Sequence, residues 1–208
     1  MNTYKTQYAD LHFERAGLFK ALREKYDPKD VLYPGCSVHV TPSLYFPHVV
    51  YVDQSEAAKQ FFADEKSLLE FVNRNKQYKP SAHIRFLLGD YSGSLPLREG
   101  NFDLLLSLFA GGIAKACAKY LRPGGLLLTN NHQGDAHQAA SDPGLRLKAT
   151  IQFKRGSYSI REEDPGKVTI PAQKPDNRYL RQVSRGVEYV EGEIYYVFER
   201  FQPRKVAG

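Results

Sequence analysis

Three residues at matched positions of the sequence could together hold a nucleoside. Gly35 follows a short apolar run, Asp53 follows a second run eighteen residues further on, and Asp90 follows a third. A glycine lets the backbone approach a ligand, and a carboxylate about 20 residues later is the group that hydrogen-bonds ribose hydroxyls in nucleotide-binding sheets. A carboxylate after the third run could accept a hydrogen bond from an adenine amino group. The alternative is that Asp53 and Asp90 are helix caps or turn residues.

The stretch VLYPGCSVHVTPS, residues 31–43, departs from the phosphate-binding motifs. It contains one glycine, and neither a GxGxxG nor a Walker sequence is present in the chain. Those motifs bring backbone amides to phosphates through closely spaced glycines. NAD and nucleoside triphosphates are therefore not expected as ligands. Thr41 and Pro42 predict a helix start, with Thr41 as N-cap, and Pro47 ends this helix within about two turns.

Other side chains of reactive or metal-binding types do not form a recognisable sequence motif. His132 could act as a base, or could bind a metal with Asp135 and His137. The five-residue spacing of the two histidines matches neither a helix face nor a strand face, so no metal site is expected. Residues 130–137 are instead expected to cap the next helix and its loop. Cys36 is expected to be a buried filler rather than a nucleophile, and His39 either lines a pocket or packs the loop.

Apolar periodicity predicts the elements that position these residues. A helix is expected over 7–26, with Leu11, Leu18 and Leu22 on its apolar stripe and Arg15 facing water. Further helices are expected over 55–73, broken near Asp64, and over 113–121. Strands are expected over the following ranges: 31–33, 48–53, 83–90, 102–109 and 125–131.

Continuous apolar strands that alternate with helices predict a mostly parallel sheet covered on both faces. After about residue 143 the pattern changes. LRLKATIQF, residues 145–153, alternates strictly, so its apolar side chains are expected on one side of a strand. EIYYVFERF, residues 193–201, is rich in aromatic and β-branched residues and predicts a strong strand. Strands at the end of an α/β chain indicate an antiparallel element in the sheet.

The successive motifs VLYPG, VVYVDQS, FLLGDYSGSLPL, FDLLLSLF and LRPGGLLLTN resemble those of class I S-adenosylmethionine-dependent methyltransferases. The resemblance covers nearly the whole chain. It implies an α/β, Rossmann-like, doubly wound, mostly parallel seven-stranded sheet of order 3-2-1-4-5-7-6, with strand 7 antiparallel and helices on both faces. It also implies one domain over 1–208, with a helical segment over 1–28, a cofactor-binding half over 29–142 and a strand-rich half over 143–208.

The resemblance further implies S-adenosylmethionine as cofactor and methyl transfer to a small molecule or a macromolecule. By the same likeness, groups near Gly35 approach the methionine part, Asp53 holds the ribose, Asp90 and Tyr91 flank the adenine, and the end of the fourth strand lines the pocket floor. The implied cofactor-binding residues are Tyr33, Gly35, Cys36, Ser37, Asp53, Gln54, Asp90, Tyr91, Ser107, Leu108 and Phe109. No catalytic residue is identified.

The glycine motif diverges from that of the resembled family. The family has an acidic residue two positions before its first glycine, where this chain has Tyr33, and further glycines where this chain has Ser37 and His39. Side chains at these positions add bulk and stiffness near the cofactor site. The alternative function is therefore a non-catalytic, methyltransferase-like binding module whose cofactor site is altered or lost.

Composition and charge limit the kinds of binding partner and the cellular compartment that are expected for this protein. The 208 residues carry a formal net charge of +6, which favours an anionic partner. Basic residues gather at 146–155 and 178–185, but nucleic acid is the less favoured partner because such clusters are usually solvated faces. No Asn-Pro-Pro-Tyr-like sequence follows the fourth strand, which disfavours DNA base amino groups as acceptors. No apolar run approaches the roughly 20 residues of a membrane span and no signal core is present, so a cytoplasmic protein without membrane contact is expected.

Overall fold

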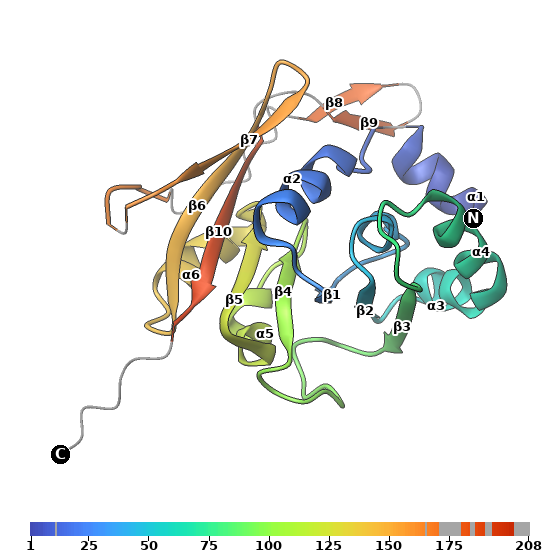
Figure 1. Cartoon of the computed structure of the whole chain (residues 1–208), viewed down its shortest axis with the longest axis horizontal. Coiled ribbons are helices and arrows are strands. Elements are labelled where there is room, and N and C mark those ends of the chain that lie inside the picture. Colours follow the sequence, from blue (N-terminus) through green and yellow to red (C-terminus); the bar gives the residue numbers. More distant parts are fainter. Residues whose placement is uncertain (11, 165, 171–179, 184–185, 190–192, 202–208) are drawn as a thin grey trace.

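The computed structural model describes residues 1–208 except 11, 165, 171–179, 184–185, 190–192 and 202–208 (Figure 1). An eight-stranded sheet of order β3-β2-β1-β4-β5-β10-β6-β7 forms its centre. The strands are β1 (Asp30–Pro34), β2 (His48–Asp53), β3 (His83–Leu88), β4 (Phe102–Ser107), β5 (Leu121–Thr129), β6 (Leu145–Lys154), β7 (Ser157–Glu162) and β10 (Ile194–Arg200). A separate two-stranded sheet pairs β8 (Leu180–Val183) with β9 (Gly186–Tyr189).

Strand direction follows the predicted pattern. Strands β1 to β5 are parallel to one another, and β10 lies antiparallel between β5 and β6. The predicted order 3-2-1-4-5-7-6 is thereby confirmed, with β10 as the seventh strand. The sheet has one strand more than predicted, because β7 pairs antiparallel with β6 at the edge. Sequence analysis missed β7 because SYSIRE has no continuous apolar face, and its residues are exposed or half-buried.

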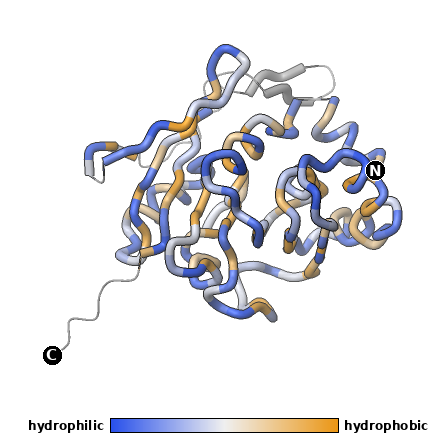
Figure 2. The backbone as a smooth tube through the Cα atoms, viewed as in Figure 1, coloured by the Kyte–Doolittle hydropathy of each residue, from blue (hydrophilic) through white to orange (hydrophobic). Residues whose placement is uncertain are grey.

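Helices cover both faces of the sheet, as predicted. The helices are α1 (Asn2–Tyr4), α2 (Ala16–Tyr26), α3 (Glu56–Ala63), α4 (Glu65–Asn75), α5 (Ile113–Cys117) and α6 (Asp135–Ala140). One core cluster packs α2, α3 and α4 against the sheet, and the other packs α5 and α6 against the opposite face. Figure 2 shows hydrophobic residues concentrated along the central strands, while the turn between β6 and β7 is hydrophilic.

Three local predictions need correction. The helix over 7–26 is wrong: a π-helix (Lys5–Ala9) follows α1, and α2 begins only at Ala16. Leu11 of its predicted stripe lies outside the described residues. After β1, Thr41 is the first residue of a 3-10 helix (Thr41–Leu44) rather than its N-cap. The helix over 113–121 ends as α-helix at Cys117 and continues as a 3-10 helix (Ala118–Tyr120).

The apolar residues of β6 do not share one face. The register with β10 shifts between Leu147 and Ala149. Leu147 therefore joins the core on the α5 and α6 side, whereas Ala149 and Ile151 join the opposite core. A bulge inserts one residue into a strand and reverses the faces beyond it, and the letters LRLKATIQF carry no signal of this insertion.

No helix within the described parts of the chain is long and apolar enough to cross a membrane.

Candidate functional site

The turn after β1 requires glycine at position 35. Gly35 has φ +65°, and a Cβ at this position would lie 2.8 Å from the Cβ of Ala110. Its N–H donates to the carbonyl of Val52 at the end of β2, at 2.8 Å. The backbone of β1 therefore closes onto the residues after β4, at the point where the strand order reverses and ligands bind in doubly wound sheets.

Asp53 holds the turn in place from the end of β2. Its Oδ2 accepts from the N–H of Ser37 at 2.8 Å, and its Oδ1 accepts from the N–H of Ser55 at 2.8 Å. Ser37 itself has φ +48°, a left-handed conformation that this hydrogen bond helps to hold. Each carboxylate oxygen has two lone-pair directions, so turn formation leaves Asp53 capacity for a ligand.

Asp90 also forms a turn. Its Oδ1 accepts from the N–H of Ser92 at 2.8 Å, which lowers the pKa of this exposed carboxyl. The neighbouring Tyr91 points back toward the first turn: its ring lies 3.5 Å from the Cβ position of Gly35, and its hydroxyl donates to the carbonyl of Gly111 at 3.0 Å. Residues after β1, β3 and β4 thus meet at one edge of the sheet.

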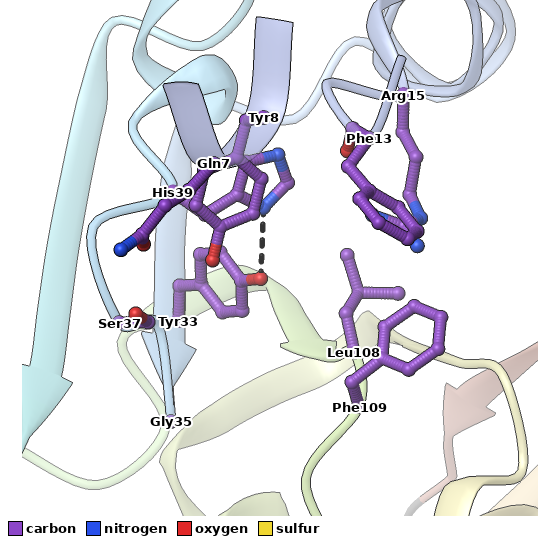
Figure 3. A pocket seen from close by; sticks show the side chains of 10 residues that line it. All are labelled: Gln7, Tyr8, Phe13, Arg15, Tyr33, Gly35, Ser37, His39, Leu108 and Phe109. Atoms are coloured by element: carbon purple, nitrogen blue, oxygen red, sulfur yellow. Dashed lines mark hydrogen bonds between the residues drawn. The ribbon is translucent and has the colours of Figure 1, made fainter. Parts of the chain in front are cut away.

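A cavity of about 420 Å³ opens above this edge. Its size lies in the range of about 300–1,000 Å³ that is usual for small-molecule sites. Figure 3 shows Gln7, Tyr8, Tyr33 and His39 along one wall, facing Phe13, Arg15, Leu108 and Phe109 along the other. Gly35 and Ser37 complete its lining.

His39 is a neutral wall residue with a defined tautomer. Its Nε2 lies 3.2 Å from the carbonyl oxygen of Glu14, which can only accept, so Nε2 carries the proton. The Nδ1 atom therefore accepts from the hydroxyl of Tyr33, at 3.0 Å. Burial and the positive charge of Arg15 lower the pKa of His39 to about 3. Tyr8 stacks on the imidazole with ring centroids 4.4 Å apart, so His39 both lines the cavity and packs the loop.

Arg15 is buried in the opposite wall. Its Nε donates to the hydroxyl of Tyr195 at 3.0 Å and lies 3.7 Å from a carboxylate oxygen of Glu193. Its Nη1 donates to the carbonyl of Phe13 at 2.7 Å, and the guanidinium lies 4.4 Å from the ring centre of Phe109. Burial lowers the pKa of Arg15, but the neighbouring oxygens of Tyr195 and Glu193 raise it by more than burial lowers it. The pKa therefore lies above its ordinary value and the group stays charged.

The structure separates the residues implied for cofactor binding into three groups. Tyr33, Gly35, Ser37, Leu108 and Phe109 line the cavity. Cys36 and Ser107 are buried, and burial raises the pKa of the Cys36 thiol well above its usual value. The others lie outside the cavity lining: Asp53, Gln54, Asp90 and Tyr91.

Sequence analysis missed the cavity residues of the N-terminal segment. Arg15 was expected to face water, yet it is 5% exposed. Gln7, Tyr8 and Phe13 line the cavity because the chain leaves helical geometry between Ala9 and Ala16. No proline marks this break in ADLHFERAG, so local sequence contained no signal from which these residues could have been found.

The polar residues after β5 cap neighbouring helices, as expected. The Oδ1 of Asn131 accepts from the N–H groups of Ala136 and His137 at 3.1 and 3.2 Å, and so caps α6. Asp135 is fully buried and accepts from the N–H of Ala114 at 3.0 Å, at the start of α5. Burial raises the pKa of Asp135 and lowers the pKa of His132.

The predicted basic clusters are only partly described. Arg146 and Lys148 pair with Glu199 at 3.2 and 2.8 Å, which reduces the charge that they present to a partner. Arg178 and Arg185 lie outside the described residues, and so does the side chain of Arg181.

Comparison with known proteins identifies the architecture. No family model matches the sequence, and no curated protein matches it. Among solved structures, a SAM-dependent methyltransferase from Thermotoga maritima is 13% identical, with a TM-score of 0.54 over 97% of this chain and 95% of that chain. The N-methyltransferase NodS from Bradyrhizobium japonicum is 14% identical, with a TM-score of 0.52 over 93% of this chain and 98% of that chain.

Other matches vary in extent. The YcgJ protein from Bacillus subtilis is 17% identical, with a TM-score of 0.50 over 92% of this chain and 99% of that chain. In two further matches the chain spans 60% and 59% of the other structure. Identities this low bear on fold alone. Together with the strand order and the reversal point between β1 and β4, they show that this chain has the fold of class I SAM-dependent methyltransferases.

Proposed function

We propose that this protein transfers a methyl group from S-adenosylmethionine to an acceptor that enters the cavity above Gly35. The observation that carries the proposal is that cavity, which lies at the reversal point of a methyltransferase fold. The methionine part would lie against Gly35 and the neighbouring Tyr33, Cys36 and Ser37. When bound, the cofactor supplies an electrophilic methyl group, and the chain's task is alignment, which provides much of the acceleration in such transfers.

The contacts around Gly35 fit this ligand. The left-handed turn brings the backbone of Gly35 close to the side chain of Ala110 and to the ring of Tyr91, where a Cβ would not fit. Asp53, at the end of β2, and Gln54 would hold the ribose, and Asp90, after β3, would contact the adenine. Leu108 and Phe109 would form the floor, next to the buried Ser107 at the end of β4. The proposed cofactor would thus run along the outer ends of four neighbouring strands.

The bulk at positions 37–40 does not fill the cavity. Val38 and Val40 are buried, with exposed fractions of 1% and 0%, and neither lines the cavity. The imidazole of His39 forms a wall rather than a plug. The extra side chains of this loop therefore leave space above Gly35.

One observation favours the second candidate, a binding module without catalysis. Asp53 does not line the cavity, and both of its oxygens accept hydrogen bonds from the turn. A site altered in this way could hold a ligand in the cavity without holding a nucleoside. The two candidates differ in whether S-adenosylmethionine binds.

Calorimetry with S-adenosylmethionine and S-adenosylhomocysteine tests the proposal. Both ligands are expected to release or absorb heat and to raise the melting temperature, because a ligand at about 100 times its Kd stabilises the folded state by about 2.7 kcal/mol. Neither heat nor stabilisation with millimolar ligand would reject methyl transfer from this cofactor and favour the second candidate.

Two glycine substitutions show whether the ligand lies above Gly35. Gly35→Ala introduces a Cβ 2.8 Å from Ala110 at φ +65°, whereas Gly124→Ala has φ +78° and no atom within 4 Å. Both variants bear the backbone strain of about 1–2 kcal/mol. Only Gly35→Ala is expected to weaken S-adenosylhomocysteine binding, by at least about tenfold, or 1.4 kcal/mol. Equal affinities in the two variants would place the ligand elsewhere.

A further inference from the structure

One ionised side chain faces the cavity. Among the described residues of its lining, Arg15 alone carries a charge at neutral pH, because His39 has a pKa of about 3. The carboxylate of Glu193 pairs with Nε of Arg15, which also donates to Tyr195, and Glu193 does not line the cavity. The pair therefore presents its positive end to the cavity.

The charge of Arg15 acts across the cavity on the residues of the facing wall. Burial raises the pKa of Tyr8 and of Tyr33, and the charge of Arg15 opposes that rise in each case. The same charge contributes to the low pKa of His39. A cation buried in a region of low dielectric interacts strongly with a ligand charge. The cavity is thus electrostatically suited to negatively charged oxygen and unsuited to ammonium groups.

Aromatic side chains supply most of the remaining lining. Tyr8, Tyr33 and His39 stand on one wall, and Phe13 and Phe109 stand on the other (Figure 3). The guanidinium lies 5.3 Å from the ring centre of Phe13 and 4.4 Å from that of Phe109, so both rings hold its orientation. Walls of this kind favour a flat ring, which gains stacking and edge-to-face contacts.

We propose that the acceptor is a small aromatic molecule bearing an anionic oxygen, a phenolate or a carboxylate, and that Arg15 binds this oxygen. This inference rests on the proposed function. In the transfer, a lone pair of the oxygen forms a C–O bond to the methyl carbon while the C–S bond breaks and its electron pair stays on sulfur. The anion and the sulfonium cation yield a neutral ether or ester and a neutral thioether. A carboxylate acceptor is already ionised at neutral pH, whereas a phenol releases its proton to solvent when its phenolate form binds Arg15. No proton then has to leave during the transfer itself, which accords with a lining in which both nitrogens of His39 already have hydrogen-bond partners.

Wild-type protein and three ligands of nearly the same shape test the charge preference. Benzoate carries one negative charge, benzamide is neutral, and benzamidine carries one positive charge. Their affinities are to be measured by calorimetry in the presence of saturating S-adenosylhomocysteine. The expected order is benzoate, then benzamide, then benzamidine, with at least about tenfold between the first and last, which is 1.4 kcal/mol. A flat or reversed order, or no benzoate binding at about 10 mM, would overturn the inference.

The methyl donor is a second source of anionic oxygen, because its amino-acid part carries a carboxylate. If Arg15 binds that carboxylate, benzoate and S-adenosylhomocysteine compete. If Arg15 binds the acceptor, both bind at once and the affinity for benzoate is undiminished by S-adenosylhomocysteine. Competition would therefore overturn the assignment to the acceptor.

Variants test the role of Arg15. Because Arg15→Met alone leaves Glu193 as a buried uncompensated charge, the double variant Arg15→Met, Glu193→Gln is used. It is expected to bind the three ligands within about threefold of one another, while Arg74→Gln, whose side chain is 78% exposed on α4, keeps the wild-type order. A double variant that folds and still prefers benzoate would overturn the inference.

The test separates this inference from the proposed function. If S-adenosylhomocysteine does not bind but benzoate is preferred in its absence, methyl transfer fails and the anion preference of the cavity stands. If S-adenosylhomocysteine binds and benzoate is not preferred, the proposed function stands and the acceptor class fails.

Discussion

At the residue scale, the cavity depends on backbone conformations that few side chains tolerate. Gly35, Ser37 and Phe109 all have positive φ, at 65°, 48° and 56°. A residue other than glycine in this region is strained by about 1–2 kcal/mol, and such strain gathers at functional sites. Here hydrogen bonds hold the strained residues: Ser37 donates to Asp53, and Phe109 donates to Asn130 at 3.2 Å.

His39 is expected to make stability depend on pH. Its folded pKa of about 3 lies below the ordinary value of 6.5, so between these values the unfolded chain binds more protons. The contribution of neutral His39 to the unfolding free energy is complete above about pH 6.5 and is lost as the pH falls toward about 3. From about pH 7 to about pH 5, the wild type should lose about 2 kcal/mol more unfolding free energy than His39→Asn, by urea titration.

The control for this prediction is His137→Asn on the exposed side of α6. It should preserve the pH dependence of the wild type. Equal pH dependence in wild type and His39→Asn would contradict the prediction and indicate that His39 is protonated in the folded state at moderate pH.

At the scale of elements, the N-terminal segment closes the cavity instead of extending α2. Tyr4 of α1 is buried, and its hydroxyl donates to Glu14 at 3.0 Å and accepts from Thr41 at 2.9 Å. Tyr8 of the π-helix stacks on His39. Helix periodicity predicted one straight helix here, because the apolar spacing of α2 continues toward the N-terminus in sequence. Contacts with the loop after β1, which are distant in sequence, decide otherwise.

Two tyrosine substitutions test the anchoring of this segment. Tyr4→Phe removes a hydroxyl that is hydrogen-bonded to buried Thr41, and should lower the unfolding free energy by about 1–2 kcal/mol. Tyr26→Phe, at the end of α2, removes a buried hydroxyl that has no hydrogen-bond partner among the described residues. It should be neutral or stabilising by up to about 1 kcal/mol. Urea unfolding measures both, and similar losses would show that Tyr4 does not anchor the segment.

At the scale of the molecule, the antiparallel strand joins the two ends of the chain. β10 lies between β5 and β6, and this position brings Tyr195 and Glu193 against Arg15. Asn130 after β5 donates to the other oxygen of Glu193 at 2.9 Å. The side chain of Arg15 in the cavity wall is therefore held by residues from the far end of the sequence. Its position depends on the pairing of β10 within the sheet.

A double-mutant cycle measures this long-range link. Glu193→Gln and Arg15→Met should each cost about 3–5 kcal/mol, because each leaves a buried charge uncompensated. The double variant should cost less than their sum by at least about 1 kcal/mol. The exposed pair Lys25 and Glu162, 2.7 Å apart, gives the control cycle, with coupling below about 1 kcal/mol. Additive losses at Arg15 and Glu193 would show that the two side chains do not interact in solution.

The sequence by itself indicated the parallel strands and the glycine turn, and its resemblance to a known family implied the strand order. Strands β1 and β4 are largely apolar and buried, as two covered faces require, and Gly35 occupies a backbone conformation that disfavours other residues. Local periodicity also located the break between α3 and α4 at Asp64.

Only the tertiary structure decided the cavity. The exit of the chain from helical geometry before Arg15, the bulge in β6 and the meeting of Arg15 with Glu193 all depend on contacts between residues far apart in sequence. Periodicity reports which face of an element is buried, but not which partner covers it. A charged residue such as Arg15 therefore resembles a solvated one until the fold supplies its counter-charge.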